Sequence, residues 1–151
     1  FRLATLFQMT YPGAPCVYYG DEIGMEGRHD PDCRRTFSWD QGTWNYSLRD
    51  YVKQCIALRK AHPALCASGE FEVLYKGATG YPFVFKRTAG SESILVALNP
   101  SAQTVEACLP SEYFSNVPQA LYGPPQPFTR ADGGWKLSLP GVSGGVYQLL
   151  D

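Results

Sequence analysis

The feature that most constrains the fold is a series of short apolar runs that fills the chain from residue 67 to its end. Each run has the length and the β-branched or aromatic composition of a strand, and Gly, Pro and Asn residues separate one run from the next. The runs are residues 71–75, 82–87, 94–99, 104–109, 120–122, 135–139 and 146–150. This regular spacing predicts an antiparallel β-sandwich of about seven strands over residues 67–151.

The first 66 residues follow a different period. Apolar side chains recur at the spacing of one helical face in residues 48–61, and the first ten residues resemble the end of a further amphipathic helix. Ser47 with Asp50 matches a capping box weakly, and Pro63 ends the helix because the residue before a proline avoids the helical region. We expect a helix from about residue 48 to 61.

Composition and charge exclude several classes of protein. Apolar residues make up 44% of the chain, and the formal charge of −1 comes without a block of lysine or arginine. We therefore expect a globular protein with no nucleic-acid partner. No apolar run approaches the roughly 20 residues that a membrane helix needs, so no membrane partner is expected either.

The five cysteines are expected to be reduced. They lie at wide spacings without a C-x-x-C pair, which argues against a disulfide framework and a zinc site. His62 and Cys66 are four residues apart, but Pro63 between them breaks a shared helical face, so no metal is expected there. Reduced thiols favour a cytoplasmic location.

Residues 11–35 pass abruptly from apolar to charged. The run Cys16 to Tyr19 is bounded by Pro12-Gly13 and Gly20, which is typical of a strand buried on both faces of a parallel sheet. In such sheets and barrels, substrates bind to the loops beyond the carboxyl ends of the strands. The charged loop that follows is therefore a candidate binding site.

Three stretches carry a resemblance to a known family. The motif "GAPCVYYGDEIGM" at residues 13–25 resembles the eighth barrel strand and following loop of the α-amylase family of glycoside hydrolases. "DPDCRR" at 30–35 points to the branch of cyclomaltodextrinases, maltogenic amylases and neopullulanases, and "ALRKAHPAL" at 57–65 is similar to the last barrel helix. The resemblance implies an α+β fragment: residues 1–66 as the last strand and helices of a (β/α)8 barrel, and residues 67–151 as an all-β antiparallel sandwich domain.

The resemblance also implies a retaining mechanism, for which two carboxyl groups lie about 5 Å apart. The family's nucleophile, general acid and stabilising aspartate come from earlier barrel strands and have no counterpart here, so we expect no catalytic residue in this chain. Asp21 and Glu22 do not replace them, because neighbouring residues at a strand end point to opposite faces. Bracing the loop by accepting hydrogen bonds from backbone amides is the simpler role for both.

By residue-wise carry-over of the resemblance, Asp30 and Arg34 are the contacts to the minus-side sugars. A carboxylate with a guanidinium offers sugar hydroxyls both acceptors and donors in a fixed fork. Internal salt bridges within the loop are the alternative that the residues leave open. Arg28 stands where the family has glycine and Thr36 where it has proline, which leaves the shape of the loop and the reach of Asp30 open.

Aromatic residues near the loop could stack on sugar rings, although packing is the commoner role. Those that flank the loop are Trp39, Trp44 and Tyr46. Trp135 alternates with Leu137 and Leu139, which predicts a place in the sandwich core. We expect His29 to be a solvated loop histidine.

Two functions remain. The chain is either the carboxyl-terminal portion of a hydrolase of α-glucans such as cyclodextrin, pullulan, starch or maltooligosaccharides, or a non-catalytic module for carbohydrate binding or assembly. The motif density of residues 11–35 favours the hydrolase, with an α-glucan oligosaccharide as its partner. No cofactor is indicated, although calcium occurs in the family. An isolated barrel strand with its helices would expose an apolar face, so we expect the separate chain to self-associate.

Overall fold

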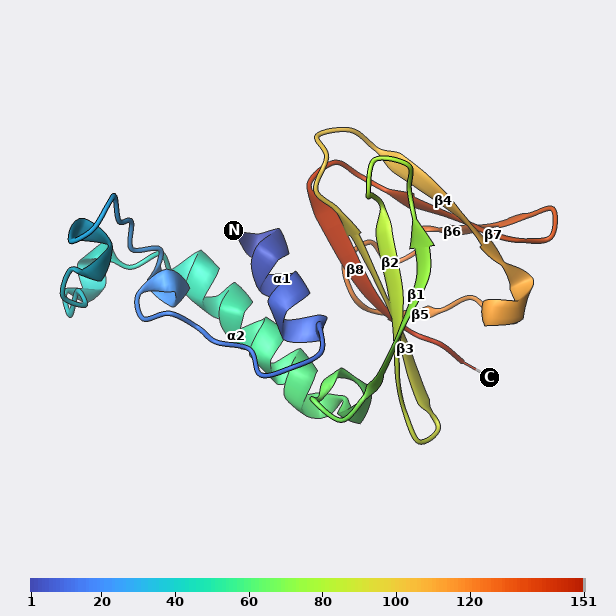
Figure 1. Cartoon of the computed structure of the whole chain (residues 1–151), viewed down its shortest axis with the longest axis horizontal. Helices are drawn as coiled ribbons and strands as arrows, with labels where there is room; N and C mark the ends of the chain where they lie inside the picture. The colour runs from blue at the N-terminus through green and yellow to red at the C-terminus, as the bar shows by residue number, and fades with distance from the viewer. Residues whose placement is uncertain (151) are drawn as a thin grey trace.

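The computed structural model of the chain describes residues 1–150, and Figure 1 shows its course. Two α-helices, α1 (Arg2–Thr10) and α2 (Tyr46–Ala61), precede all the strands of the described chain. The strands are β1 (Glu70–Lys76), β2 (Phe83–Ala89), β3 (Glu92–Asn99), β4 (Val105–Pro110), β5 (Gln119–Tyr122), β6 (Phe128–Ala131), β7 (Gly134–Leu139) and β8 (Ser143–Gln148). Short 3-10 turns connect several of these elements.

The strands form two antiparallel sheets, as the sequence predicts. One sheet has the order β1-β2-β3-β8-β5 and the other the order β4-β7-β6. Each predicted run overlaps a strand, although some of the bounds differ by one to three residues, and β6 was missed. In "FTRA" only Phe128 is buried, so this edge strand lacks the alternation of apolar and polar residues that marks its neighbours.

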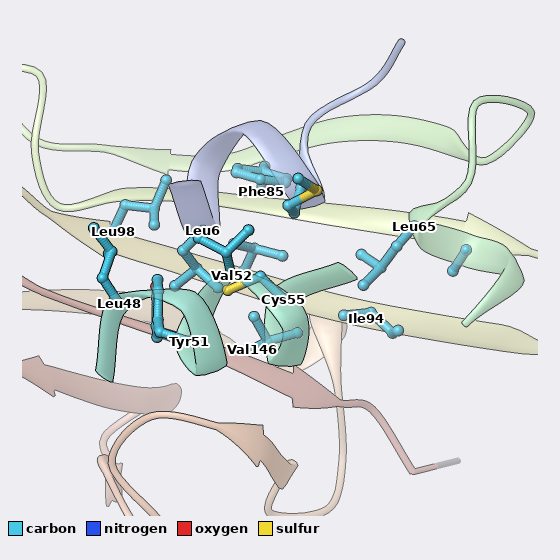
Figure 2. Packing of buried hydrophobic residues seen from close by; sticks show 13 residues of the cluster. Leu6, Leu48, Tyr51, Val52, Cys55, Leu65, Phe85, Ile94, Leu98 and Val146 are labelled. Carbon is cyan, nitrogen blue, oxygen red and sulfur yellow. The ribbon is translucent and has the colours of Figure 1, made fainter. Parts of the chain in front are cut away.

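The five-stranded sheet is the middle layer of three. Its one face packs against α1 and α2, and its other face packs against the three-stranded sheet (Figures 1 and 2). In β3, Ile94 and Val96 face the helices, whereas Leu95 and Ala97 face the second sheet, and all four are fully buried. Because β3 is covered on both faces, its apolar run is continuous instead of alternating.

The helices depend on this sheet for their stability. A helix of nine residues such as α1 is marginal in water, because helix nucleation is costly. Leu6 from α1 and Val52 and Cys55 from α2 are buried against Phe85 and Val146 of the sheet (Figure 2). Burying each of the larger apolar side chains contributes roughly 1.5–3 kcal/mol, which fixes both helices on the sheet.

Two local predictions need correction. Helix α2 begins earlier than expected, because the side chain of Asn45 accepts a hydrogen bond from the backbone N–H of Leu48 and caps the helix, and the Ser47 capping box is not used. The strand predicted at residues 16–19 is not formed: these residues have no regular strand structure, and their side chains are exposed. A strand needs a partner for its N–H and C=O groups, and no described segment pairs with this one.

Most of the connection between α1 and α2 extends away from the sheets. Figure 1 shows that it first runs beside α2, in blue, and that its outer part, in teal, lies at the end of α2 that points away from both sheets. The loop that carries Asp30 and Arg34 therefore projects from a layered body instead of lying on it. In the described chain neither helix has the length and the apolar character needed to cross a bilayer.

Candidate substrate-binding loop

The loop between the helices is closed at its base by backbone hydrogen bonds. The N–H of Asn45 donates to the carbonyl oxygen of Ile23 (3.0 Å), and Ile23 is buried. Gly20 has a φ of 93°, a left-handed conformation that favours glycine, and its carbonyl accepts from the N–H of Met25 (2.9 Å). The loop thus leaves and returns to a fixed base beside the first turn of α2.

Asp30 and Arg34 form an ion pair near the outer end of this loop. Both Nε and Nη2 of Arg34 donate to one oxygen, Oδ1 of Asp30, at 2.8 and 2.5 Å. The side chains are 60% and 67% exposed, so the pair contributes little to folding. Within the described chain, Oδ2 of Asp30 and Nη1 of Arg34 have no partner, which leaves an acceptor beside a donor on the open side.

A second pair fixes the shape of the same loop. Asp32 accepts hydrogen bonds from the guanidinium of Arg35 at 2.5 and 2.6 Å and from the backbone N–H of Arg28 at 2.9 Å. The hydrogen bond from Arg35, followed by that from Arg28, lowers the pKa of Asp32 below its ordinary value. The internal salt bridges that the sequence left open as an alternative do form. Arg28 stands where the family has glycine, and its backbone N–H is held in the loop by the hydrogen bond to Asp32.

Glu22 has the bracing role that the sequence suggested. Its Oε2 accepts a hydrogen bond from the backbone N–H of Gly20 at 2.9 Å. Asp21 instead lines a cleft of about 200 Å³ with Tyr18, Tyr19 and Arg35. The hydroxyl of Tyr19 donates to the carbonyl oxygen of Arg35 at 2.8 Å, a hydrogen bond across the cleft that the sequence did not predict.

The aromatic residues divide into packed and open ones. Trp44 donates its indole N–H to the carbonyl oxygen of Ser38 (2.8 Å) and lies under the guanidinium of Arg49, so it packs as expected. Trp135 is confirmed in the sandwich core at 5% exposure. Trp39 does not follow the expectation of packing, because it is 81% exposed and touches Phe37 edge-on.

The remaining candidates behave as follows. His29 is exposed, as predicted for a solvated histidine. All five cysteines are free thiols. No group of three or more His, Cys, Asp or Glu side chains among residues 1–150 is arranged to hold a metal ion. In the loop, the ion pair of Asp30 and Arg34 places a hydrogen-bond acceptor beside hydrogen-bond donors on an exposed surface.

Comparisons with known proteins agree with these features. Residues 71–144 match the family described as the C-terminal domain of maltogenic amylase. A cyclomaltodextrinase from Geobacillus thermopakistaniensis is 41% identical over 109 residues, which make up 72% of this chain and 18% of that relative. Neopullulanase 2 from Thermoactinomyces vulgaris is 42% identical over 99 residues, which make up 66% of this chain and 17% of that relative. The chain thus spans less than a fifth of these relatives.

Solved structures match over almost the whole chain. The native form of the Nostoc punctiforme debranching enzyme superposes with a TM-score of 0.83 at 35% identity, covering 97% of this chain and 30% of that one. An α-amylase from Geobacillus thermoleovorans, complexed with acarbose, gives a TM-score of 0.83 at 30% identity and covers 99% of this chain and 33% of that one. The similarity therefore includes the helices and the loop as well as the β-sandwich.

Proposed function

Because this chain corresponds to the carboxyl-terminal part of an α-amylase family glycoside hydrolase of the cyclomaltodextrinase, maltogenic amylase and neopullulanase branch, we propose that it supplies one wall of the glucan site in a longer enzyme. The substrates are α-glucans: cyclodextrin, pullulan, starch or maltooligosaccharides. Residues 1–66 close a (β/α)8 barrel, and residues 67–151 form the β domain that follows it.

The observation that carries this proposal is the exposed fork of Asp30 and Arg34. A fork held by its own ion pair loses little conformational entropy when a ligand binds. Its free oxygen and free N–H groups can take two neighbouring hydroxyls of one glucose unit. We assign these two residues to sugar contacts on the minus side of the scissile bond.

The carboxylates that cut the bond belong to the part of the enzyme that precedes this chain. Retaining hydrolysis needs a nucleophile and a general acid about 5 Å apart on either side of the bond. Glu22 is engaged with the backbone N–H of Gly20, which supports a role in shaping the loop instead of in catalysis. This chain therefore contributes recognition and support, and its upstream neighbours contribute the acid and the nucleophile.

The exposed run at residues 16–19 supports the barrel assignment. Val17, Tyr18 and Tyr19 are 39%, 47% and 42% exposed, an unusual state for three consecutive large apolar residues. Pairing with neighbouring parallel strands would bury them on both faces. In the separate chain the same residues promote self-association. The five free thiols support a cytoplasmic location.

The test is a chimera. This chain would replace the corresponding carboxyl-terminal segment of the Geobacillus thermopakistaniensis cyclomaltodextrinase, and release of reducing sugar from cyclodextrin, pullulan and starch would be measured. We expect activity in the chimera and none in the 151-residue chain. Asp30→Ala and Arg34→Ala should raise KM about tenfold or more, the cost of losing a charged hydrogen bond to a sugar. Asp132→Asn, which changes an exposed carboxylate in the β domain, is the matched control.

The alternative function gives a different result. A non-catalytic carbohydrate-binding or assembly module would bind maltooligosaccharides or itself as the separate chain, and its exchange into the cyclomaltodextrinase would give an inactive enzyme. Wild-type KM in the Asp30 and Arg34 variants would remove these two residues from the site. Hydrolysis by the 151-residue chain alone would show that its own carboxylates are catalytic.

A further inference from the structure

Two arginines are buried where α1 ends. Arg87, from β2, has no exposed surface, and Arg59, from α2, is 9% exposed. Neither is paired with a carboxylate in the described chain, and both donate to backbone carbonyl oxygens instead. Burial, followed by the nearby charge of Arg59, lowers the pKa of Arg87. Two buried cations side by side, without an anion, need an explanation.

Arg59 holds the exit from α1. Its Nη1 donates to the carbonyl oxygens of Met9 (2.8 Å) and Tyr11 (3.1 Å), and its Nη2 donates to that of Gly13 (2.5 Å). Arg59 therefore binds three carbonyl groups within residues 9–13, just before the exposed run that leads to the loop. Only a planar fork with several fixed N–H groups can reach all three oxygens at once.

Arg87 holds the same exit from the side of the β domain. Its Nη1 donates to the carbonyl oxygen of Thr10, the last residue of α1, at 2.8 Å. The rest of the guanidinium binds the segment that joins α2 to β1. These bonds run from Nη2 to the oxygens of Cys66 (2.6 Å) and Gly69 (3.0 Å) and from Nε to that of Glu70 (3.0 Å).

The electrostatics of a helix end explain why cations are stable there. The last carbonyl groups of a helix have no partner within it, and they carry a partial negative charge. The last turn of α1 has no basic residue of its own, so the cations come from elsewhere in the fold. Residue 69 must be glycine, because a Cβ there would collide with the backbone carbonyl oxygen of Ala64, and it would also lie 2.9 Å from Nη2 of Arg87.

We propose that Arg59 and Arg87 are positioning residues for the candidate substrate-binding loop: by binding the carbonyl groups of residues 9–13 they fix the direction in which the chain leaves α1, and so, together with the loop base at Ile23 and Asn45, the place of Asp30 and Arg34 relative to the β domain. The proposal rests on the function proposed above for that loop. The proposal gives the β domain a role in shaping the site, since the side chain of Arg87 links strand β2 by a hydrogen bond to the chain that leads to the loop.

The structure provides natural reporters for a test on the 151-residue chain. Cys33 lies in the loop and Cys108 in β4, and both are exposed free thiols. Spin labels on these two cysteines, in a background of Cys16→Ser and Cys66→Ala, would report the distribution of loop-to-sheet distances. Dilution with unlabelled protein would separate this distance from contacts between copies. Arg87→Lys and Arg59→Lys keep the charge but replace the planar fork, whose separate nitrogens reach carbonyl groups on different segments, with a single nitrogen.

We expect one narrow distribution in the wild-type chain and one about twice as broad in Arg87→Lys, since loss of the arginine's hydrogen bonds releases a local segment while the sheets stay folded. Arg59→Lys should behave similarly. Arg130→Lys is the control, because Arg130 is exposed and stacks on Trp135, far from α1 in the sequence. Amide exchange should rise at Tyr11, whose N–H donates to Phe7, and not at Val96 in the middle of the sheet.

Each other result would overturn the proposal. Narrow distributions in both lysine variants, or a broad one in the wild-type chain, would show that the arginines do not set the position of the loop. A rise in exchange that is equal at Tyr11 and Val96 would reduce them to a role in global stability. These readouts need no sugar, so they are independent of the chimera test: a loop that is held in place but makes no sugar contact would refute the proposed function and leave the positioning role standing.

Discussion

Two apolar runs that both have the pattern of a buried strand have different structures in this chain. Residues 94–98, "ILVAL", are the centre of β3, with strands on both sides, helices on one face and a second sheet on the other. Residues 16–19, "CVYY", form no strand and stay exposed. The comparison teaches that an apolar run becomes a strand only where partners for its backbone groups are available. We call the covered β-sandwich around β3 the closed region, and the exposed run at residues 16–19 with the charged loop after it the open region.

The largest effect is expected from breaking the closed region. Asn99 is fully buried at the end of β3, and its side-chain amide donates to the carbonyl oxygens of Gln103, Leu139 and Pro140 while its oxygen accepts from Ser101. Asn99→Ala leaves these groups unsatisfied, and we expect it to lower the free energy of unfolding by about 3 kcal/mol. Urea unfolding followed by the fluorescence of the core tryptophan measures the loss.

Ser101→Ala is the matched control for this variant. It removes a hydroxyl at the partly exposed rim of the same network and should cost about 1 kcal/mol. Equal losses in the two variants would mean that the network does not depend on the buried amide.

A second prediction concerns an unsatisfied group in the closed region. The hydroxyl of Tyr147 is buried between the sheets, and it has no hydrogen-bond partner in the described chain. Burial raises the pKa of this hydroxyl above its ordinary value. Tyr147→Phe keeps the edge-on contact with Phe128 and should raise the free energy of unfolding by about 1 kcal/mol. Calorimetric melting checks the sign, and a loss of stability would reveal a partner for the hydroxyl.

The contrast between the two regions also explains which parts of the molecule could be predicted from the sequence. The strands after residue 67 were found because their partners lie within the chain, so the local pattern and the final environment agree. Edge strand β6 was missed, since one buried Phe128 makes no pattern. Internal salt bridges among the charged residues packed into the loop were foreseen as an alternative, whereas the contact of Asp30 and Arg34 with sugar stays a prediction.

The buried arginines show what a pattern cannot reveal. Arg87 lies on the same face of β2 as Phe83 and Phe85. The alternation of side chains along the strand predicts that this position is buried, whereas an arginine is normally expected at the surface. Its role depends on carbonyl groups at residues 10, 66, 69 and 70, which come together only in the folded chain. Tertiary hydrogen bonds to the backbone leave no trace in the sequence.

The open region should respond differently to substitution. Val17→Ser with Tyr18→Ser removes exposed apolar surface, so we expect a change in unfolding free energy within about 0.5 kcal/mol. The same double variant should reduce self-association of the 151-residue chain, measured by light scattering over a range of concentrations. A control pair, Val73→Ser with Val117→Ser, removes exposed valines from the β domain. A wild-type chain that stays monomeric throughout would show that the open run does not drive association.

The smallest effect is an acid transition of the loop. The folded pKa of Asp32 is lowered from its ordinary value near 3.8 by the hydrogen bond from Arg35, so the loop gains order that is fully present above the ordinary pKa and is lost as the pH falls through the lowered one. Carboxyl chemical shifts followed by NMR should show Asp32 titrating below its ordinary value near 3.8. In Asp32→Asn the N–H signal of Arg28 should no longer shift with acid. If Asp32 instead titrates at its ordinary value, its ion pair with Arg35 is not populated in solution, and the loop is less ordered than its hydrogen bonds indicate.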